Sequence, residues 1–65
     1  MELKDLLACI GKEQAVEVQD LTGKKLGYFL DAKDVSPRFH NRDVAKIWII
    51  DDGDWAFKFA IQVKD

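Results

Sequence analysis

The alternation of residues from Trp55 to Val63 constrains the fold more than any other feature of this sequence. Large apolar side chains occupy every second position of the segment, namely Trp55, Phe57, Phe59, Ile61 and Val63. Successive side chains of a strand point to opposite sides of the sheet, so a period of two predicts a strand with one buried face. The rest of the chain must supply an element that covers this aromatic face.

An amphipathic helix is predicted from Met1 to Ile10. Four apolar residues recur at helical spacing and form one stripe: Leu3, Leu6, Leu7 and Ile10. Gly11 follows the last of them and predicts a left-handed cap at the end of the helix. A helix this short is marginal alone in water, so we expect its apolar stripe to dock on the sheet.

Three more strands are predicted from alternating apolar and polar residues, over Ala15–Asp20, Lys25–Asp31 and Asp43–Asp51. Asp20 and Gly23 provide the turn chemistry of a first β-hairpin, with a positive φ expected at Gly23. The acidic sequence at residues 51–54, which contains Asp-Gly, predicts the tight turn of a second β-hairpin. Between the hairpins, Pro37 prevents a long helix but allows one helical turn.

These elements predict an α+β fold, in which the N-terminal helix packs on a four-stranded, mostly antiparallel sheet made of two β-hairpins. The sheet face toward the helix is expected to contain Val16, Val18, Leu26, Tyr28, Leu30, Ile47, Ile49, Phe57 and Phe59. The opposite face is expected to contain Phe29, Val44, Trp48 and Ile50, beside the small Ala56 and Ala60.

The length of 65 residues allows a single domain spanning residues 1–65. Apolar residues make up 48% of the chain and charged residues 34%, which favours a folded chain over a disordered one. A chain this short buries only roughly 60% of its unfolded surface, so its core is marginal without an additional constraint. Cys9 is the sole cysteine and no signal peptide is recognisable, which predicts a reduced, cytoplasmic protein. We therefore expect the fold to be stabilised by homo-oligomerisation.

Residues with catalytic or metal chemistry are sparse. His40 has no serine or cysteine partner in a recognisable arrangement, so we predict that the protein is not an enzyme and needs no cofactor. Asp51, Asp52 and Asp54 crowd one turn, but the spacing and terminal glutamate of an EF-hand are missing, which predicts no metal site. The net charge of −2, and the lack of an apolar run of ~20 residues, argue against duplex nucleic acid and membranes as partners.

The loop after the second strand concentrates cationic side chains. Arg38, His40 and Arg42 point the same way in an extended loop, and Arg38 and Arg42 meet at i,i+4 in a helical turn. Guanidinium groups bind phosphate or carboxylate through two parallel hydrogen bonds. We therefore predict that Arg38, His40 and Arg42 bind a small anionic ligand such as a signalling nucleotide, with Phe39 or Trp48 stacked on its base.

The two arginines also have a structural interpretation. Asp34 and Asp43 lie close to Arg38 and Arg42 in the sequence, so internal salt bridges would occupy the guanidinium groups without any ligand. The sequence leaves both interpretations open.

Apolar residues on the sheet face away from the helix predict a contact surface. Phe29, Trp48 and Ile50 are the expected interface residues, and the simplest partner is a second copy of the chain. Alternatively, the sheet curls so that the loop around Phe39 covers part of this face. The same surface suggests an alternative function, in which the protein docks on a host protein and inhibits it, with Trp48 as the buried anchor.

Three segments carry a resemblance to other proteins: LKDLL at Leu3–Leu7, VEVQDLTGKKLG at Val16–Gly27, and DVAKIWI at Asp43–Ile49 with the apolar end that follows. The chain resembles small uncharacterised accessory proteins of phages and integrated mobile elements of gram-positive bacteria. The resemblance implies an accessory role such as antagonism of host defence, and it attaches no catalytic residue. We therefore expect a small counter-defence protein that sequesters its ligand as a homo-oligomer.

Overall fold

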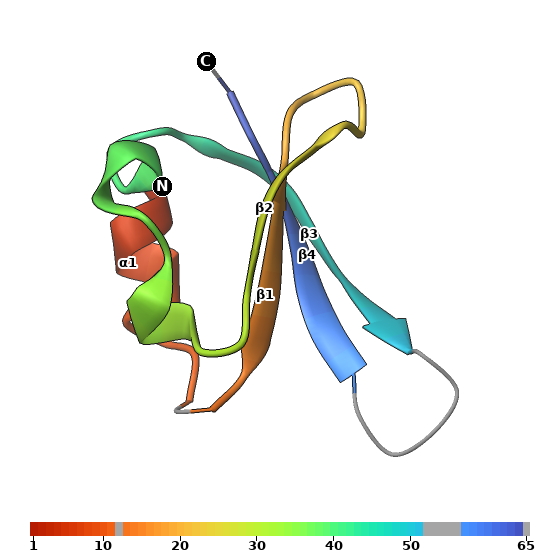
Figure 1. Cartoon of the computed structure of the whole chain (residues 1–65). Helices are drawn as coiled ribbons and strands as arrows, with labels where there is room; N and C mark the ends of the chain where they lie inside the picture. The colour runs from red at the N-terminus through yellow and green to blue at the C-terminus, as the bar shows by residue number, and fades with distance from the viewer. Residues whose placement is uncertain (12, 52–56, 65) are drawn as a thin grey trace.

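The computed structural model describes residues 1–11, 13–51 and 57–64, and shows a small α+β fold (Figure 1). Within these residues the elements in chain order are the helix α1 (Leu3–Leu7), the strands β1 (Ala15–Gln19) and β2 (Lys25–Phe29), the short 3₁₀ helices η1 (Ala32–Asp34) and η2 (Pro37–Phe39), and the strands β3 (Val44–Asp51) and β4 (Phe57–Val63). The helical segments gather on one side of the sheet (Figure 1).

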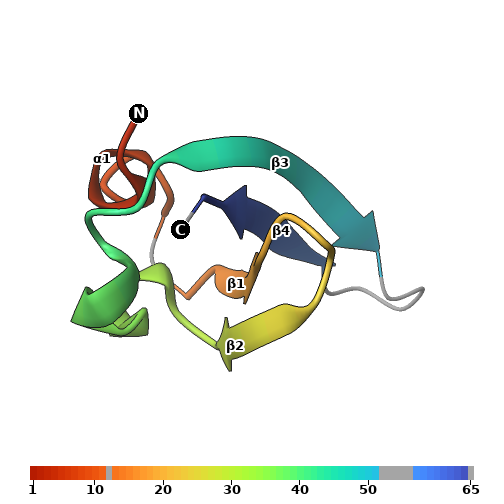
Figure 2. The ribbon, with the colours of Figure 1, turned by 90° about the horizontal axis from the view of Figure 1, so that it is seen from above.

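The sheet has four strands in the order β2-β1-β4-β3 (Figure 2). The outer pairs, β1 with β2 and β3 with β4, are antiparallel, whereas the central strands β1 and β4 are parallel. The α+β class and the mostly antiparallel sheet predicted from the sequence are therefore confirmed. The parallel central pair places β3 at one edge of the sheet and β2 at the other.

The turn between β1 and β2 is organised by the side chain of Asp20. Its Oδ1 accepts hydrogen bonds from the backbone nitrogen of Thr22 at 2.9 Å, the hydroxyl of Thr22 at 2.6 Å and the backbone nitrogen of Lys24 at 3.0 Å. Gly23 adopts a φ of 89°, the left-handed conformation predicted for it. Local turn chemistry thus fixes this connection.

The helix α1 is shorter at both ends than the predicted span from Met1 to Ile10. At its start, the backbone nitrogen of Leu3 donates to the carbonyl of Arg42 at 2.9 Å, and that of Val44 donates to Met1 at 2.8 Å, so the first residues pair with the chain entering β3. At Cys9 and Ile10, bonds to the residue three positions back replace the α-helical pattern. The left-handed cap predicted at Gly11 is wrong, since the described residues with positive φ are Glu13 and Gly23.

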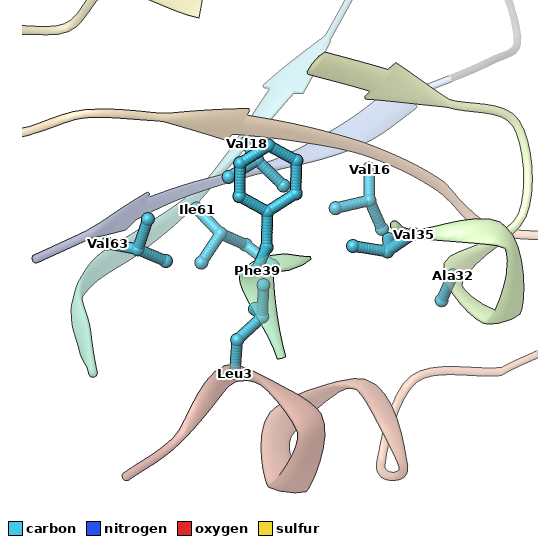
Figure 3. Close-up of a cluster of buried hydrophobic side chains, with 8 residues drawn as sticks. All are labelled: Leu3, Val16, Val18, Ala32, Val35, Phe39, Ile61 and Val63. Atoms are coloured by element: carbon cyan, nitrogen blue, oxygen red, sulfur yellow. The ribbon is translucent and has the colours of Figure 1, made fainter. Parts of the chain in front are cut away.

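The core lies between the sheet and the helical segments, and Phe39 stands at its centre (Figure 3). The buried cluster is formed by Leu3, Val16, Val18, Ala32, Val35, Phe39, Ile61 and Val63. Phe39 projects from η2 toward Val18 and Ile61 on the sheet, while Leu3 approaches from α1 (Figure 3). Burial of large apolar side chains is the main force that holds such a small fold together.

The facing predicted for β2 is wrong. Val16 pairs with Phe29 and Val18 pairs with Gly27, so these β2 residues lie on the helix side of the sheet. Tyr28 therefore points to the opposite face, and Leu30 lies beyond the strand and is highly exposed. An irregularity in the register after Val18 brings Leu26 back toward the core, as predicted.

A second register shift changes the start of β3. It lies between Val44 and Lys46, and Val44 pairs with the buried Val63 and packs against the core. The prediction that Val44 faces away from the helix is wrong, because an extra residue in one strand moves the following side chains to the other face.

The helical layer covers only part of the sheet face. Phe59 is partly buried against the core cluster, as predicted. Ile47, Ile49 and Phe57 belong to the same face but remain 41%, 57% and 48% exposed. The reason is geometric, since β3 and β4 extend past the short helix (Figure 1).

Candidate functional site

Phe39, the predicted stacking residue, is unavailable to a ligand. It is 2% exposed and belongs to the core cluster, where its ring meets that of Phe29 edge-to-face at a centroid distance of 6.4 Å. A base cannot stack on Phe39 unless the core opens. The same contact removes Phe29 from the predicted interface, because its side chain packs against the core.

The two arginines of the loop converge on the ring of Phe39. The guanidinium carbon of Arg38 lies 4.6 Å from the ring centroid and that of Arg42 lies 5.3 Å from it, both within cation–π range. Within the described part of the chain, Arg38 forms no salt bridge with Asp34 or Asp43. The convergence expected from the sequence is present, and it is organised around an aromatic ring.

His40 holds the loop against the helix. Its Nε2 lies 3.0 Å from the carbonyl oxygen of Val35, and because a carbonyl can only accept, Nε2 carries the proton. The backbone carbonyl of His40 accepts a hydrogen bond from the nitrogen of Lys4 at 3.0 Å. These two bonds fix the imidazole at the edge of a pocket.

A pocket of about 250 Å³ lies where α1 meets η1. Its lining is formed by Lys4, Leu7, Ala8, Ile10, Gly11, Asp31, Ala32, Lys33 and His40. The aliphatic residues form the apolar part of the lining, here called the floor, and two lysines, the carboxylate of Asp31 and the imidazole complete it. Among the predicted ligand residues, His40 contributes to this lining, whereas Arg38, Phe39 and Arg42 do not.

The lysines of the pocket carry the charge that an anion would meet. Lys4 Nζ lies 3.7 Å from Glu2 Oε1, and Lys33 Nζ lies 3.9 Å from Asp31 Oδ2. Both lysine side chains are exposed, and exposed ion pairs at such distances contribute only about 0–1 kcal/mol. Either ammonium group can therefore turn toward a ligand at small cost.

Asp31 is directed toward the backbone. Its Oδ1 accepts from the nitrogen of Lys33 at 3.0 Å and caps η1, and its Oδ2 accepts from the nitrogen of Glu13 at 3.1 Å. These bonds disperse the negative charge over backbone donors. The carboxylate thus shapes the pocket and opposes an incoming anion less than an unbonded carboxylate would.

The opposite face of the sheet has a polar centre. The carboxylate of Glu17 accepts a hydrogen bond from Gln19 Nε2 at 2.6 Å and pairs with Lys58 Nζ at 3.0 Å. Burial raises the pKa of Glu17, but the hydrogen bonds from Gln19 and Lys58 and the charges of Lys58 and Lys25 outweigh it and hold the pKa below its ordinary value. These polar groups interrupt the continuous apolar patch that the sequence predicts for this face.

Trp48 and Ile50 lie on this polar face and are half-buried. Trp48 pairs with the fully buried Ala60 of β4, and the ammonium of Lys46 lies 5.2 Å from the centroid of its ring. Their predicted facing is correct, and whether they form an interface remains a proposal. Both residues belong to the edge strand β3.

Parts of two predictions fall outside the described residues. The acidic turn contains Asp52 and Asp54, and the aromatic strand was expected to begin at Trp55; none of these positions is described. Within the described ranges, no helix is long and apolar enough to cross a membrane.

Comparison with models of protein families, with curated proteins and with solved structures gives no match to this chain.

Proposed function

We propose that this chain is a non-enzymatic binding protein that captures a small anionic ligand in the pocket between α1 and η1. The observation that supports this function is that one pocket is lined both by two lysines, Lys4 and Lys33, and by aliphatic side chains. A site of this kind binds molecules with a charged end and an apolar body. The ammonium group of lysine is a compact point charge with three donors, so it can bind either a carboxylate or a phosphate.

The size and lining of the pocket narrow the ligand class. Its volume of about 250 Å³ is below the range of about 300–1,000 Å³ that is usual for ligand sites, so only a small ligand would fit. The floor is formed by aliphatic side chains such as Leu7 and Ile10, which suit an aliphatic body better than a flat base. A nucleotide would have to be held by its phosphate, because Phe39 is buried. We favour a small carboxylate or phosphate ester with an apolar group.

Sequestration is the role that fits such a site. Binding lowers the free concentration of the ligand without chemistry, and it suits the counter-defence role implied by the resemblance to phage and mobile-element accessory proteins. Each binding site removes one ligand molecule from solution, so the effect depends on the abundance of the protein and on its affinity for the ligand.

Calorimetric titration tests this function directly. The panel contains hexanoate, hexyl phosphate, and cyclic and linear nucleotides, each titrated into the parent chain. The double substitution Lys4→Gln and Lys33→Gln should lower affinity at least tenfold, since hydrogen bonds to charged groups are worth ~1.5–3 kcal/mol each. Thermal melts check that each variant stays folded.

The matched control is the double substitution Arg38→Gln and Arg42→Gln. Like the lysine variant it removes two positive charges, but from the loop that the sequence predicts as the ligand site. The affinity of this arginine variant for the ligand should stay within about twofold of the parent's, whereas that of the lysine variant should fall. An equal loss in both variants would indicate non-specific attraction to positive charge. No binding by the parent to any probe would reject this function for those ligand classes.

A second candidate function is inhibition of a host protein by docking. It is favoured by the exposed apolar residues of β3 and β4, Ile47, Ile49 and Phe57, together with Trp48 on the other face. Such residues commonly anchor protein interfaces. A pull-down from host lysate with the parent and with Trp48→Ala separates this candidate from ligand capture, since the pocket lysines play no part in it.

A further inference from the structure

The two edge strands of the sheet, β2 and β3, differ in how strongly they resist the addition of another strand. β2 spans only Lys25–Phe29, carries a glycine in its interior, and is interrupted within the strand by its register shift against β1, whereas the register shift of β3 lies at its start, between Val44 and Lys46. β3 spans Val44–Asp51 and is mostly apolar, with Lys46 as its one interior charge. Short, irregular and charged edges discourage strand addition, whereas a long apolar edge invites it. β3 is therefore the edge that can accept another strand.

The N-terminal segment already covers the beginning of this edge. The nitrogen of Leu3 donates to the carbonyl of Arg42, the nitrogen of Val44 donates to the carbonyl of Met1, and Glu2 forms an antiparallel bridge with Asp43. In the described chain no strand lies beyond β3 after that point. The edge that remains open covers residues 45–51, and its midpoint is Trp48.

We propose that a second copy of this chain pairs with β3 in antiparallel orientation about a two-fold axis at Trp48. The pairing would join two four-stranded sheets into one continuous sheet. Trp48 then faces the partner's Trp48, and Ile47 faces the partner's Ile49. An interface around a two-fold axis uses the same surface twice, which a segment symmetric about its midpoint can satisfy.

Face matching, charge and the length of edge that is paired select this register. Directly opposed residues lie on the same side of a joined sheet, so the two-fold axis must pass through a residue of β3. An axis at Lys46 would oppose two lysines, and an axis at Asp51 would oppose two carboxylates. An axis at Ile47 would oppose Asp51 with the partner's Asp43 and would collide with the covered start of the edge. With the axis at Trp48, Lys46 faces the partner's Ile50 and Asp51 faces the partner's Ala45, so like charges do not meet. An axis at Ile49 or Ile50 also avoids like charges, but it pairs fewer of residues 45–51 than an axis at Trp48 does.

The side chains near the axis gain from this contact. Ile47 and Ile49 are substantially exposed on the helix side of the sheet and would pack against their counterparts. On the other side, the indole of Trp48 meets that of the partner, and the ammonium of Lys46, already near the Trp48 ring, stays at the rim of the pair. Backbone pairing and apolar contact thus act at one place. This interface is independent of ligand capture, because none of its residues lines the pocket.

Native mass spectrometry and sedimentation test the proposal. The parent chain has a mass of 7.5 kDa and should be observed at twice that mass. Ile49→Lys should convert it to the monomer, because the new ammonium would face the partner's Ile47. Leu30→Lys is the matched control, since Leu30 is 73% exposed and lies outside β3. A parent chain that is monomeric throughout its soluble range overturns the proposal, as does a dimer that Ile49→Lys leaves intact.

Disulfide cross-linking tests the register. In a Cys9→Ser background, the double variant Lys46→Cys and Ile50→Cys should form a cross-linked dimer through two bridges, since directly opposed residues lie ~4.5–5.5 Å apart. The two positions are too distant along one strand to bridge each other. Ile47→Cys in the same background should stay uncross-linked, and its efficient cross-linking would move the axis to position 47 and refute the register. Capture of a different protein by a monomeric parent, lost in Ile49→Lys, would assign the edge to that protein and reject the dimer.

Discussion

At the scale of single residues, Phe39 has the central place in the core that the sequence pattern predicts for Phe57. Phe57 is central to the aromatic alternation, so the sequence pattern predicts a buried ring at this position. In the folded chain it lies at the start of β4, beyond the helical layer, and is about half exposed. Phe39 comes from a loop with no periodic pattern, yet it fills the space between Leu3 and the sheet.

Truncation of these two phenylalanines should therefore have opposite outcomes. Phe39→Ala removes a buried ring at a cost of ~3–5 kcal/mol, which is comparable with the whole stability that a core this small supplies. We expect Phe39→Ala to lose its cooperative thermal transition, while Phe57→Ala melts close to the parent. Circular dichroism melts measure both. A folded Phe39→Ala chain with the parent's transition would contradict the placement of this ring.

Glu17 makes the stability depend on pH. The folded state holds the pKa of Glu17 below its ordinary value of 4.5, so the unfolded chain binds more protons in the acid range. The stabilisation is complete above that ordinary value and is lost as the pH falls through the folded-state pKa. The pKa of Asp20 is also lowered, by its hydrogen bond with Thr22 first of all, and acts in the same direction.

We predict that the unfolding free energy falls on acidification below about pH 4.5, and that Glu17→Gln makes this dependence shallower. Urea titrations across the acid range measure the slope for both chains. Glu17→Gln is expected to be less stable at neutral pH, because the ion pair between Glu17 and Lys58 is lost. An unchanged slope in the variant would mean that other carboxylates dominate the acid transition.

At the scale of elements, β2 depends on a glycine for close packing. A Cβ placed on Gly27 would lie 2.9 Å from Cζ of Phe29, a distance that real contacts do not reach. Phe29 cannot move freely, because its ring packs against the core and against Phe39. The missing side chain at Gly27 therefore allows Phe29 to turn inward.

Gly27→Ala should destabilise the protein by about 1–3 kcal/mol, the usual cost of overpacking. The substitution Phe29→Leu shortens the obstructing ring, so the double variant should be more stable than the sum of the two single losses implies. Chemical denaturation of the four chains gives this coupling. Strictly additive effects would show that Gly27 and Phe29 do not share the space.

The elements themselves could be predicted from the sequence, but the facing of β2 and of the start of β3 could not. Alternation placed the strands within a few residues, and Pro37 correctly marked a single turn. Two register shifts, after Val18 and at Val44, then changed which side chains face the core, and no local pattern announces them. The pocket could not be predicted either, because Lys4 and Lys33 are distant in the sequence and line one pocket only when α1 packs beside η1.

At the scale of the whole molecule, the protein has little core for its surface. The helical layer covers one part of the sheet, and the far ends of β3 and β4 extend beyond it. Cys9 is the sole cysteine, so an intramolecular disulfide cannot compensate. Pairing at β3 would protect exposed apolar residues and the open backbone edge together, which makes assembly the expected source of additional stability.

The melting temperature of the chain should depend on dimer formation. A species that forms only from folded chains stabilises them by mass action, so the melting temperature of the parent should rise with protein concentration. Ile49→Lys should melt at a lower temperature that does not depend on concentration, while Leu30→Lys should follow the parent. Melts over a hundredfold range of protein concentration measure this difference. A parent melting temperature that stays constant over that range would show that the chain folds without a partner, and would leave the exposed edge of β3 without the role assigned to it.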